Sequence, residues 1–126
     1  MYQVEYAILK YYKNIMSDEH MNIGILFHNL TTGKCDFRYI SDFECFQEFD
    51  PDADTDFVKT YLSGMKQQIE ENTQDNHHTF SISDFAKIYV NEFRFSDITK
   101  MEVKEDKNYV NNICKKYLKS NSENTH

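Results

Sequence analysis

The stretch that decides the fold is SDEHMNIGILF at residues 17–27, a polar turn that runs directly into an apolar strand. Side chains alternate along a strand, so Ile23, Ile25 and Phe27 share one face of the strand predicted over residues 21–28. Gly24 lies inside this strand, where glycine usually marks a bulge or a close approach of the backbone. The sequence therefore predicts a strand that is irregular or closely packed against its neighbours at Gly24.

A strand is predicted on each side of this one in the chain. Residues 2–12 alternate with Val4, Tyr6 and Ile8 on one face, and the other face is half apolar, so we expect a central strand. Residues 29–33, NLTTG, form a hairpin connection in which Gly33 can supply a positive φ. Residues 34–40 form the third strand, which completes an antiparallel sheet over the first third of the chain.

Helical spacing becomes the dominant pattern after an irregular, acidic segment at residues 41–55. A helix over residues 56–72 is predicted to be buried through Phe57, Tyr61, Leu62, Met65 and Ile69. A short helix over residues 84–91 with Ser83 as its N-cap, a fourth strand from Phe93 to Val103 and a last helix over residues 106–119 follow.

This order of elements predicts one α+β domain over residues 1–119, followed by a flexible tail at residues 120–126. Strands that precede helices favour a small antiparallel sheet of three to four strands with about three helices packed on one face. The length of 126 residues is close to the commonest size of a single domain.

Composition argues against several classes of protein. The net charge of −7 argues against a generic nucleic-acid binder, which needs a basic face for the phosphates. Cys35, Cys45 and Cys114 are odd in number and lack C-x-x-C spacing, which disfavours a disulfide framework or a zinc knuckle. No apolar run approaches the length of a membrane span, and residues 1–12 lack the pattern of a signal peptide. We therefore expect a cytoplasmic protein.

Three motifs of the sheet resemble a known family. Residues 6–11 read Y-A-I-L-K-Y, residues 19–25 read E-H-M-N-I-G-I, and residues 37–39 read F-R-Y. These are similar to the Y-x-I-L-x-Y, E-x-x-N-x-G and F-R-F motifs of domain-of-unknown-function family 3037. The resemblance implies a partner role, because genes of that family often neighbour genes of HipA-like kinases. Where the family often has a basic residue before the glutamate, this chain has Ser17-Asp18, so no anion site is carried over to this loop.

A polar trio at the entry of the second strand is the first candidate site. Glu19, Asn22 and Gly24 could bind a ligand or a peptide backbone, and Arg38 could reach the same face and pair with Glu19. The structural alternative is that Asn22 and Glu19 satisfy the backbone of the preceding loop, since a buried amide must be hydrogen-bonded. Both interpretations remain open from the sequence.

Metal sites are not indicated by the acidic and histidine residues. The series Asp50, Asp52, Asp54, Asp56 resembles a calcium loop, but the glycine and glutamate that an EF-hand needs at its sixth and twelfth positions are absent. The alternative is that Asp54 or Thr55 caps the following helix. The adjacent pair His77-His78 lacks converging ligands, and no cofactor motif is present, so no metal or cofactor is expected.

These observations favour a non-enzymatic protein-binding module, and the family resemblance implies an antitoxin-like or regulatory partner of a HipA-like kinase. Aromatic residues make up 15% of the chain, more than we expect one small core to hide, and aromatic side chains are enriched at binding hot spots. The residues expected at the docking surface are Tyr11, Tyr12, Phe43, Phe46 and Phe49.

Two alternatives and one question of assembly stay open. The acidic cluster with Asp50, Asp52 and Asp54 is compatible with a phage-encoded inhibitor that occupies the basic groove of a CRISPR-type defence effector. A metal-dependent hydrolase or nuclease would use Glu19 and Asn22 with His20 or His28. An exposed strand edge could support a homodimer, but the sequence does not tell which strand forms that edge.

Overall fold

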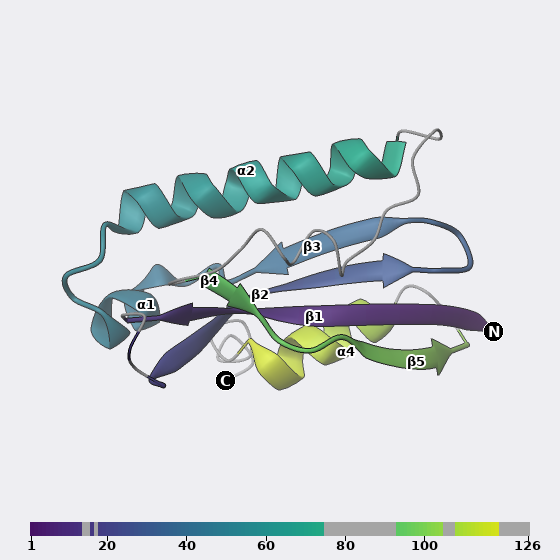
Figure 1. Cartoon of the computed structure of the whole chain (residues 1–126), viewed down its shortest axis with the longest axis horizontal. Helices are drawn as coiled ribbons and strands as arrows, with labels where there is room; N and C mark the ends of the chain where they lie inside the picture. The colour runs from purple at the N-terminus through teal and green to yellow at the C-terminus, as the bar shows by residue number, and fades with distance from the viewer. Residues whose placement is uncertain (14–15, 17, 75–92, 105–107, 119–126) are drawn as a thin grey trace.

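An antiparallel sheet lies between helices on its two faces (Figure 1). The computed structural model describes residues 1–13, 16, 18–74, 93–104 and 108–118. In these residues the elements are β1 (Tyr2–Tyr12), β2 (His20–Asn29), β3 (Cys35–Tyr39), α1 (Phe43–Phe49), α2 (Thr55–Gln74), β4 (Phe93–Phe95), β5 (Thr99–Val103) and α4 (Asn108–Tyr117). The predicted α+β class is confirmed. The predicted helix over residues 84–91, the pair His77-His78 and the tail at residues 120–126 lie outside the described residues.

Strand β1 is central, as its apolar faces predicted. The strand order is β3-β2-β1-β4, and β5 also pairs with β1. The predicted fourth strand is therefore two strands, β4 and β5, which pair with the two ends of β1. Ser96 joins them, because its backbone N–H donates to the Ile8 carbonyl at 2.8 Å and its hydroxyl accepts from the Ile8 N–H at 2.9 Å. A side chain thus replaces one rung of the ladder.

The two faces of the sheet are covered by different helices. The Tyr6 ring lies 6.1 Å from that of Tyr117 in α4, whereas the Tyr11 ring lies 4.8 Å from that of Phe46 in α1. Residues 6 and 11 of a regular strand point to opposite faces, so α1 and α4 lie on opposite sides of the sheet. Figure 1 shows α2 and α4 on opposite sides as well. The expectation that all helices share one face is thus wrong, because both faces of β1 are apolar and each needs a cover.

Gly24 combines both features that its position predicted. The β1–β2 register shifts between Leu9, which pairs with Gly24, and Lys10, which pairs with Asn22. A Cβ atom on Gly24 would lie 2.8 Å from Cζ of Phe37 and 3.3 Å from the Arg38 carbonyl oxygen. Glycine is therefore needed because the fully buried Phe37 ring packs directly on this backbone.

The prediction that residues 41–55 are irregular is wrong for part of this segment. Helix α1 begins after Asp42, whose Oδ1 accepts the Glu44 N–H at 2.9 Å. Phe46 is fully buried, and the chain leaves the helix at Asp50. An N-cap aspartate before an apolar i, i+3 pair, Phe43 and Phe46, is compatible with this short helix, but one such pair is too little to predict it.

Helix α2 is buried through a stripe that differs from the predicted one at two positions: Val58 takes the place of Phe57, and Tyr61 is only half-buried. The side chains of Val58, Leu62, Met65 and Ile69 are buried, whereas Phe57 is 58% exposed. Within the described residues, no helix is long and apolar enough to cross a membrane. Phe57 therefore presents a large aromatic side chain on the surface beside the acidic loop.

Candidate functional site

A groove of about 610 Å³ lies at the end of β1. It is formed by the end of β1, the loop between α1 and α2, the first turn of α2 and the start of β4. Its lining residues are Tyr11, Lys13, Asp50, Asp52, Ala53, Asp54, Phe57, Val58 and Phe93. We call it the acidic groove, because aspartates alternate along the loop that forms one wall.

Asp50 fixes this loop to the sheet. The Tyr11 hydroxyl donates to Asp50 Oδ2 at 2.7 Å, and the Asp52 N–H donates to Asp50 Oδ1 at 3.2 Å. The Asp50 N–H in turn donates to the Phe46 carbonyl at 2.9 Å, which ends α1. Both carboxylate oxygens are thus engaged, and Asp50 serves to position the wall of the groove.

The other two aspartates of the groove are both exposed, but they differ in what their carboxylates bind. Asp54 caps α2, because its Oδ1 accepts the Phe57 N–H at 3.1 Å, as one of the two sequence interpretations expected. Asp52 is exposed, and within the described residues its carboxylate accepts no hydrogen bond and forms no ion pair. Asp52 is therefore the carboxylate of the groove that can meet a ligand.

A row of aromatic rings leads from the core to the surface of the groove. Tyr11 lies 5.4 Å from Phe93, Phe93 stacks on Tyr61 at 4.4 Å, and Tyr61 stacks on Phe57 at 6.1 Å between ring centroids. Phe57 is the exposed end of this row. Its ring is held by stacking, so it presents an apolar surface at little cost in side-chain entropy.

A single lysine side chain joins the groove to two other predicted residues. Lys13 Nζ lies 4.9 Å from the centroid of the Phe49 ring and 3.6 Å from Glu19 Oε2. The predicted pair between Glu19 and Arg38 is wrong, because Arg38 Nε donates to Asp36 Oδ2 at 3.0 Å. Glu19 therefore belongs to the rim of the acidic groove.

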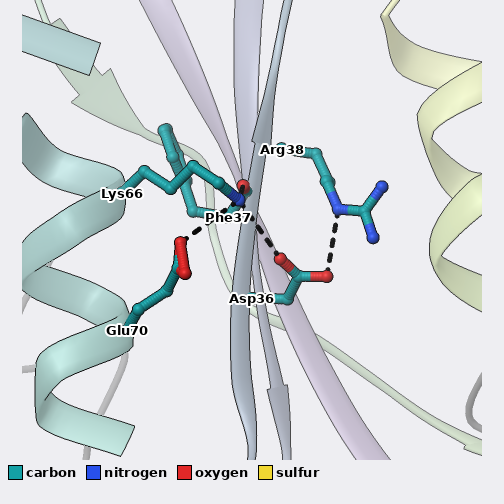
Figure 2. Close-up of polar contacts among 5 residues, drawn as sticks. All are labelled: Asp36, Phe37, Arg38, Lys66 and Glu70. Atoms are coloured by element: carbon teal, nitrogen blue, oxygen red, sulfur yellow. Dashed lines mark hydrogen bonds and ion pairs between the residues drawn. The ribbon is translucent and has the colours of Figure 1, made fainter. Parts of the chain in front are cut away.

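Arg38 belongs to a polar network at the outer edge of β3. Figure 2 shows Lys66 reaching from α2 to β3, where Nζ donates to the Phe37 carbonyl at 2.8 Å. The same nitrogen lies 3.6 Å from Asp36 Oδ1 and 3.5 Å from Glu70 Oε1. This network joins α2 to the strand edge and is separate from the groove.

The other predicted residues lie elsewhere. Asn22 Nδ2 donates to the Tyr117 carbonyl at 3.2 Å, while its buried Oδ1 has no partner among the described residues. Tyr12 lies between the His20 ring, at 5.1 Å, and the Arg94 guanidinium, at 4.2 Å. These contacts fix the end of the sheet on the α4 side.

The two remaining aromatic candidates of α1 divide between core and surface. Phe46 is fully buried against Tyr11, and Phe43 is half-buried with Lys59 Nζ 5.2 Å from its ring centroid. The groove thus unites Tyr11, Asp50, Asp52 and Asp54, with Phe49 and Glu19 at its rim, but not Tyr12, Asn22, Gly24, Arg38, Phe43 or Phe46.

The sequence had not singled out Lys13, Ala53, Phe57, Val58 and Phe93 as site residues. For two of them a signal exists. Val58 lies one helical turn before Leu62 and Phe57 lies one turn before Tyr61, so the spacing points to both residues without deciding which is buried. Phe93 joins the groove only through the pairing of β4 with β1, which no local pattern encodes.

The carboxylate and aromatic groups that line the acidic groove suit a bound cation. Carboxylates attract ammonium and guanidinium groups, and an aromatic face attracts them as well. Among the described residues, no three His, Cys, Asp or Glu side chains are placed to hold a metal ion. Burial raises the pKa of the Cys114 thiol to about 11, so this thiol stays protonated and unreactive at neutral pH.

The sequence is similar to one family over most of its length. The model of the family described as "Protein of unknown function (DUF3037)" matches residues 6–117. No curated protein and no solved structure matches the chain. The family match extends the resemblance from the motifs of β1 to β3 through all the elements that form the groove.

Proposed function

The chain belongs to the DUF3037 family, and from that premise we propose that it is a non-enzymatic protein-binding module whose acidic groove receives a basic segment of a partner protein. The observation that carries this proposal is that one groove is lined both by the exposed Phe57 ring and by Asp52, whose carboxylate has no partner among the described residues. An arginine or lysine of the partner would place its aliphatic stem on Phe57 and its charge near Asp52.

The energetics favour a partner rather than an isolated cation. An exposed charge pair contributes little by itself, about 0–1 kcal/mol. Burying the Phe57 ring against a partner side chain removes apolar surface from water and adds the larger share. The aspartates and the net charge of −7 would chiefly speed association with a basic partner.

The family resemblance suggests the identity of the partner. A HipA-like kinase with a basic segment at its surface would fit, and the module would then act as its antitoxin-like or regulatory subunit. The alternative of an inhibitor that imitates nucleic acid is less favoured, because Asp50 and Asp54 bind groups of the chain itself. The hydrolase alternative is less favoured as well, because Glu19, its candidate carboxylate, forms an ion pair with Lys13.

Calorimetric titration with a short synthetic peptide of lysine, arginine and leucine tests the proposal. We expect binding that weakens when NaCl rises from about 0.05 to 0.5 M, because salt screens exposed charges. Phe57→Ser should weaken binding about tenfold, and Asp52→Asn about three- to fivefold. A peptide of the same length with glutamate in place of the basic residues should not bind.

Matched variants separate the groove from general effects. Leu30→Ser also removes an exposed apolar side chain, and Glu71→Gln neutralises a carboxylate near the other end of α2. Both controls should bind the basic peptide like the unchanged chain. Equal losses in Leu30→Ser and Phe57→Ser, or no binding of the basic peptide at low salt, would refute the groove as a docking site.

A further inference from the structure

The two outer edges of the sheet differ in how well they are protected from pairing with another strand. Figure 1 shows β3 and β5 on opposite sides of β1. At β3, Lys66 occupies the Phe37 carbonyl, and an edge lysine opposes further strand pairing. At β5, residues 99–102 are all exposed, and among the described strands none pairs with the outer side. Within the part of the chain that the structure describes, the β5 edge is therefore the open one.

Hydrogen bonds already on β1 tell which backbone groups of β5 point outward. The Gln3 carbonyl accepts the Leu30 N–H on the β2 side, whereas Ile8 bonds to Ser96 on the β4–β5 side. Backbone groups alternate between the two sides of a strand, so Val4, four residues before Ile8, points to the same side as Ile8, toward β5. The backbone of Val4 therefore bonds with that of its partner Met101. Lys100 and Glu102 then direct their N–H and carbonyl groups away from the sheet.

We propose that β5 pairs antiparallel with β5 of a second copy of this chain, about a two-fold axis at Met101. This register places Lys100 of each copy opposite Glu102 of the other, and both residues carry the outward backbone groups that such a pair needs. Moving the axis by one residue would place Lys100 opposite Lys100 of the second copy, or Glu102 opposite Glu102. Two like charges directly opposite each other are destabilising. Charge complementarity and backbone polarity thus select the same register.

The contacts across this axis are self-complementary. Within the described residues, Lys100 and Glu102 form no ion pair and no side-chain hydrogen bond, so both are available. Met101 is 37% exposed and would meet Met101 of the second copy. The strand is only five residues long, so we expect a weak, reversible dimer. The acidic groove lies at the other end of β1, and the inference does not depend on it.

Charge reversal tests the register in solution. Sedimentation of the unchanged chain up to about 1 mM should show a monomer–dimer equilibrium. Lys100→Glu and Glu102→Lys should each raise the dimer dissociation constant at least about tenfold, and the double variant should restore it. Lys115→Glu, which makes the same change of charge on α4, should leave the equilibrium unchanged. A monomer throughout, or a double variant as weak as either single one, would overturn the proposal.

A cysteine at the axis gives a second, independent readout. Directly opposed, non-hydrogen-bonded residues lie about 4.5 Å apart at Cα, a separation that a disulfide can bridge. In a Cys45→Ser background, Met101→Cys should form a disulfide dimer on mild oxidation. Thr99→Cys should not, because the two copies of residue 99 would be about 13 Å apart. Cross-linking of Thr99→Cys with none of Met101→Cys would contradict this register.

Discussion

Gly24 and Asp50 illustrate how single residues shape the sheet and the groove. Gly24 lets the Phe37 ring lie on the backbone of β2, where a Cβ atom would come within 2.8 Å of Cζ. Asp50 uses both carboxylate oxygens to hold the loop after α1. Asp50 can therefore bind a ligand only by giving up one of these structural contacts.

Gly24→Ala should lower the free energy of unfolding by about 1–3 kcal/mol, because the buried Phe37 ring must move. Gly64→Ala is the matched control: a Cβ atom on Gly64 would meet no atom within 4 Å, so helix propensity should raise the stability by about 0.5–1 kcal/mol. Urea denaturation measures both. Adding Phe37→Leu should recover part of the Gly24→Ala loss, and strictly additive losses would contradict the proposed clash.

Cys114 predicts how stability changes in alkali. Burial raises the pKa of its thiol from 9.0 to about 11, so the folded state holds the proton more tightly than the unfolded state. This contribution is complete below pH 9.0 and is lost as the pH rises toward 11. Urea denaturation at several pH values should show that loss, and Cys114→Ala should make the decline shallower. Cys45→Ala should leave the slope unchanged; an equally steep decline in Cys114→Ala would refute the assignment.

At the scale of elements, the alternation of apolar and polar residues predicts the strands, but it does not predict where a strand is interrupted. The bounds of β1, β2 and β3 agree closely with the patterns of residues 2–12, 21–28 and 34–40. The break between β4 and β5 escaped prediction because it depends on Ser96 bonding to Ile8, far away in the sequence. Helix α1 escaped because seven residues give too few turns for a clear periodicity.

The edge of β3 yields a prediction at this scale. Lys66→Met removes the donor to the Phe37 carbonyl and should lower the free energy of unfolding by about 1 kcal/mol. It also uncovers a strand edge, so light scattering should show association beyond a dimer. Lys115→Met, on α4, is the control for the loss of a surface lysine. If the two variants associate equally, Lys66 does not guard this edge.

At the scale of the whole molecule, the layers and the groove depend on contacts between distant segments. The apolar pattern on both faces of β1 explains why helices cover both, although the order of elements had suggested one covered face. The sequence identified Tyr11, Asp50, Asp52 and Asp54 as candidate binding residues, and the groove unites them. It did not place Phe57 there, because helical spacing alone admits either Phe57 or Val58 until the sheet fixes the buried side.

An NMR titration of the ¹⁵N-labelled chain with the basic lysine–arginine–leucine peptide tests most directly whether the acidic groove is the docking site. If it is, amide shifts concentrate at Lys13, residues 50–58 and Phe93, and Phe57→Ser removes them. Shifts centred instead on β5, or on Tyr12 and Arg94 at the α4 side, would contradict docking in the acidic groove.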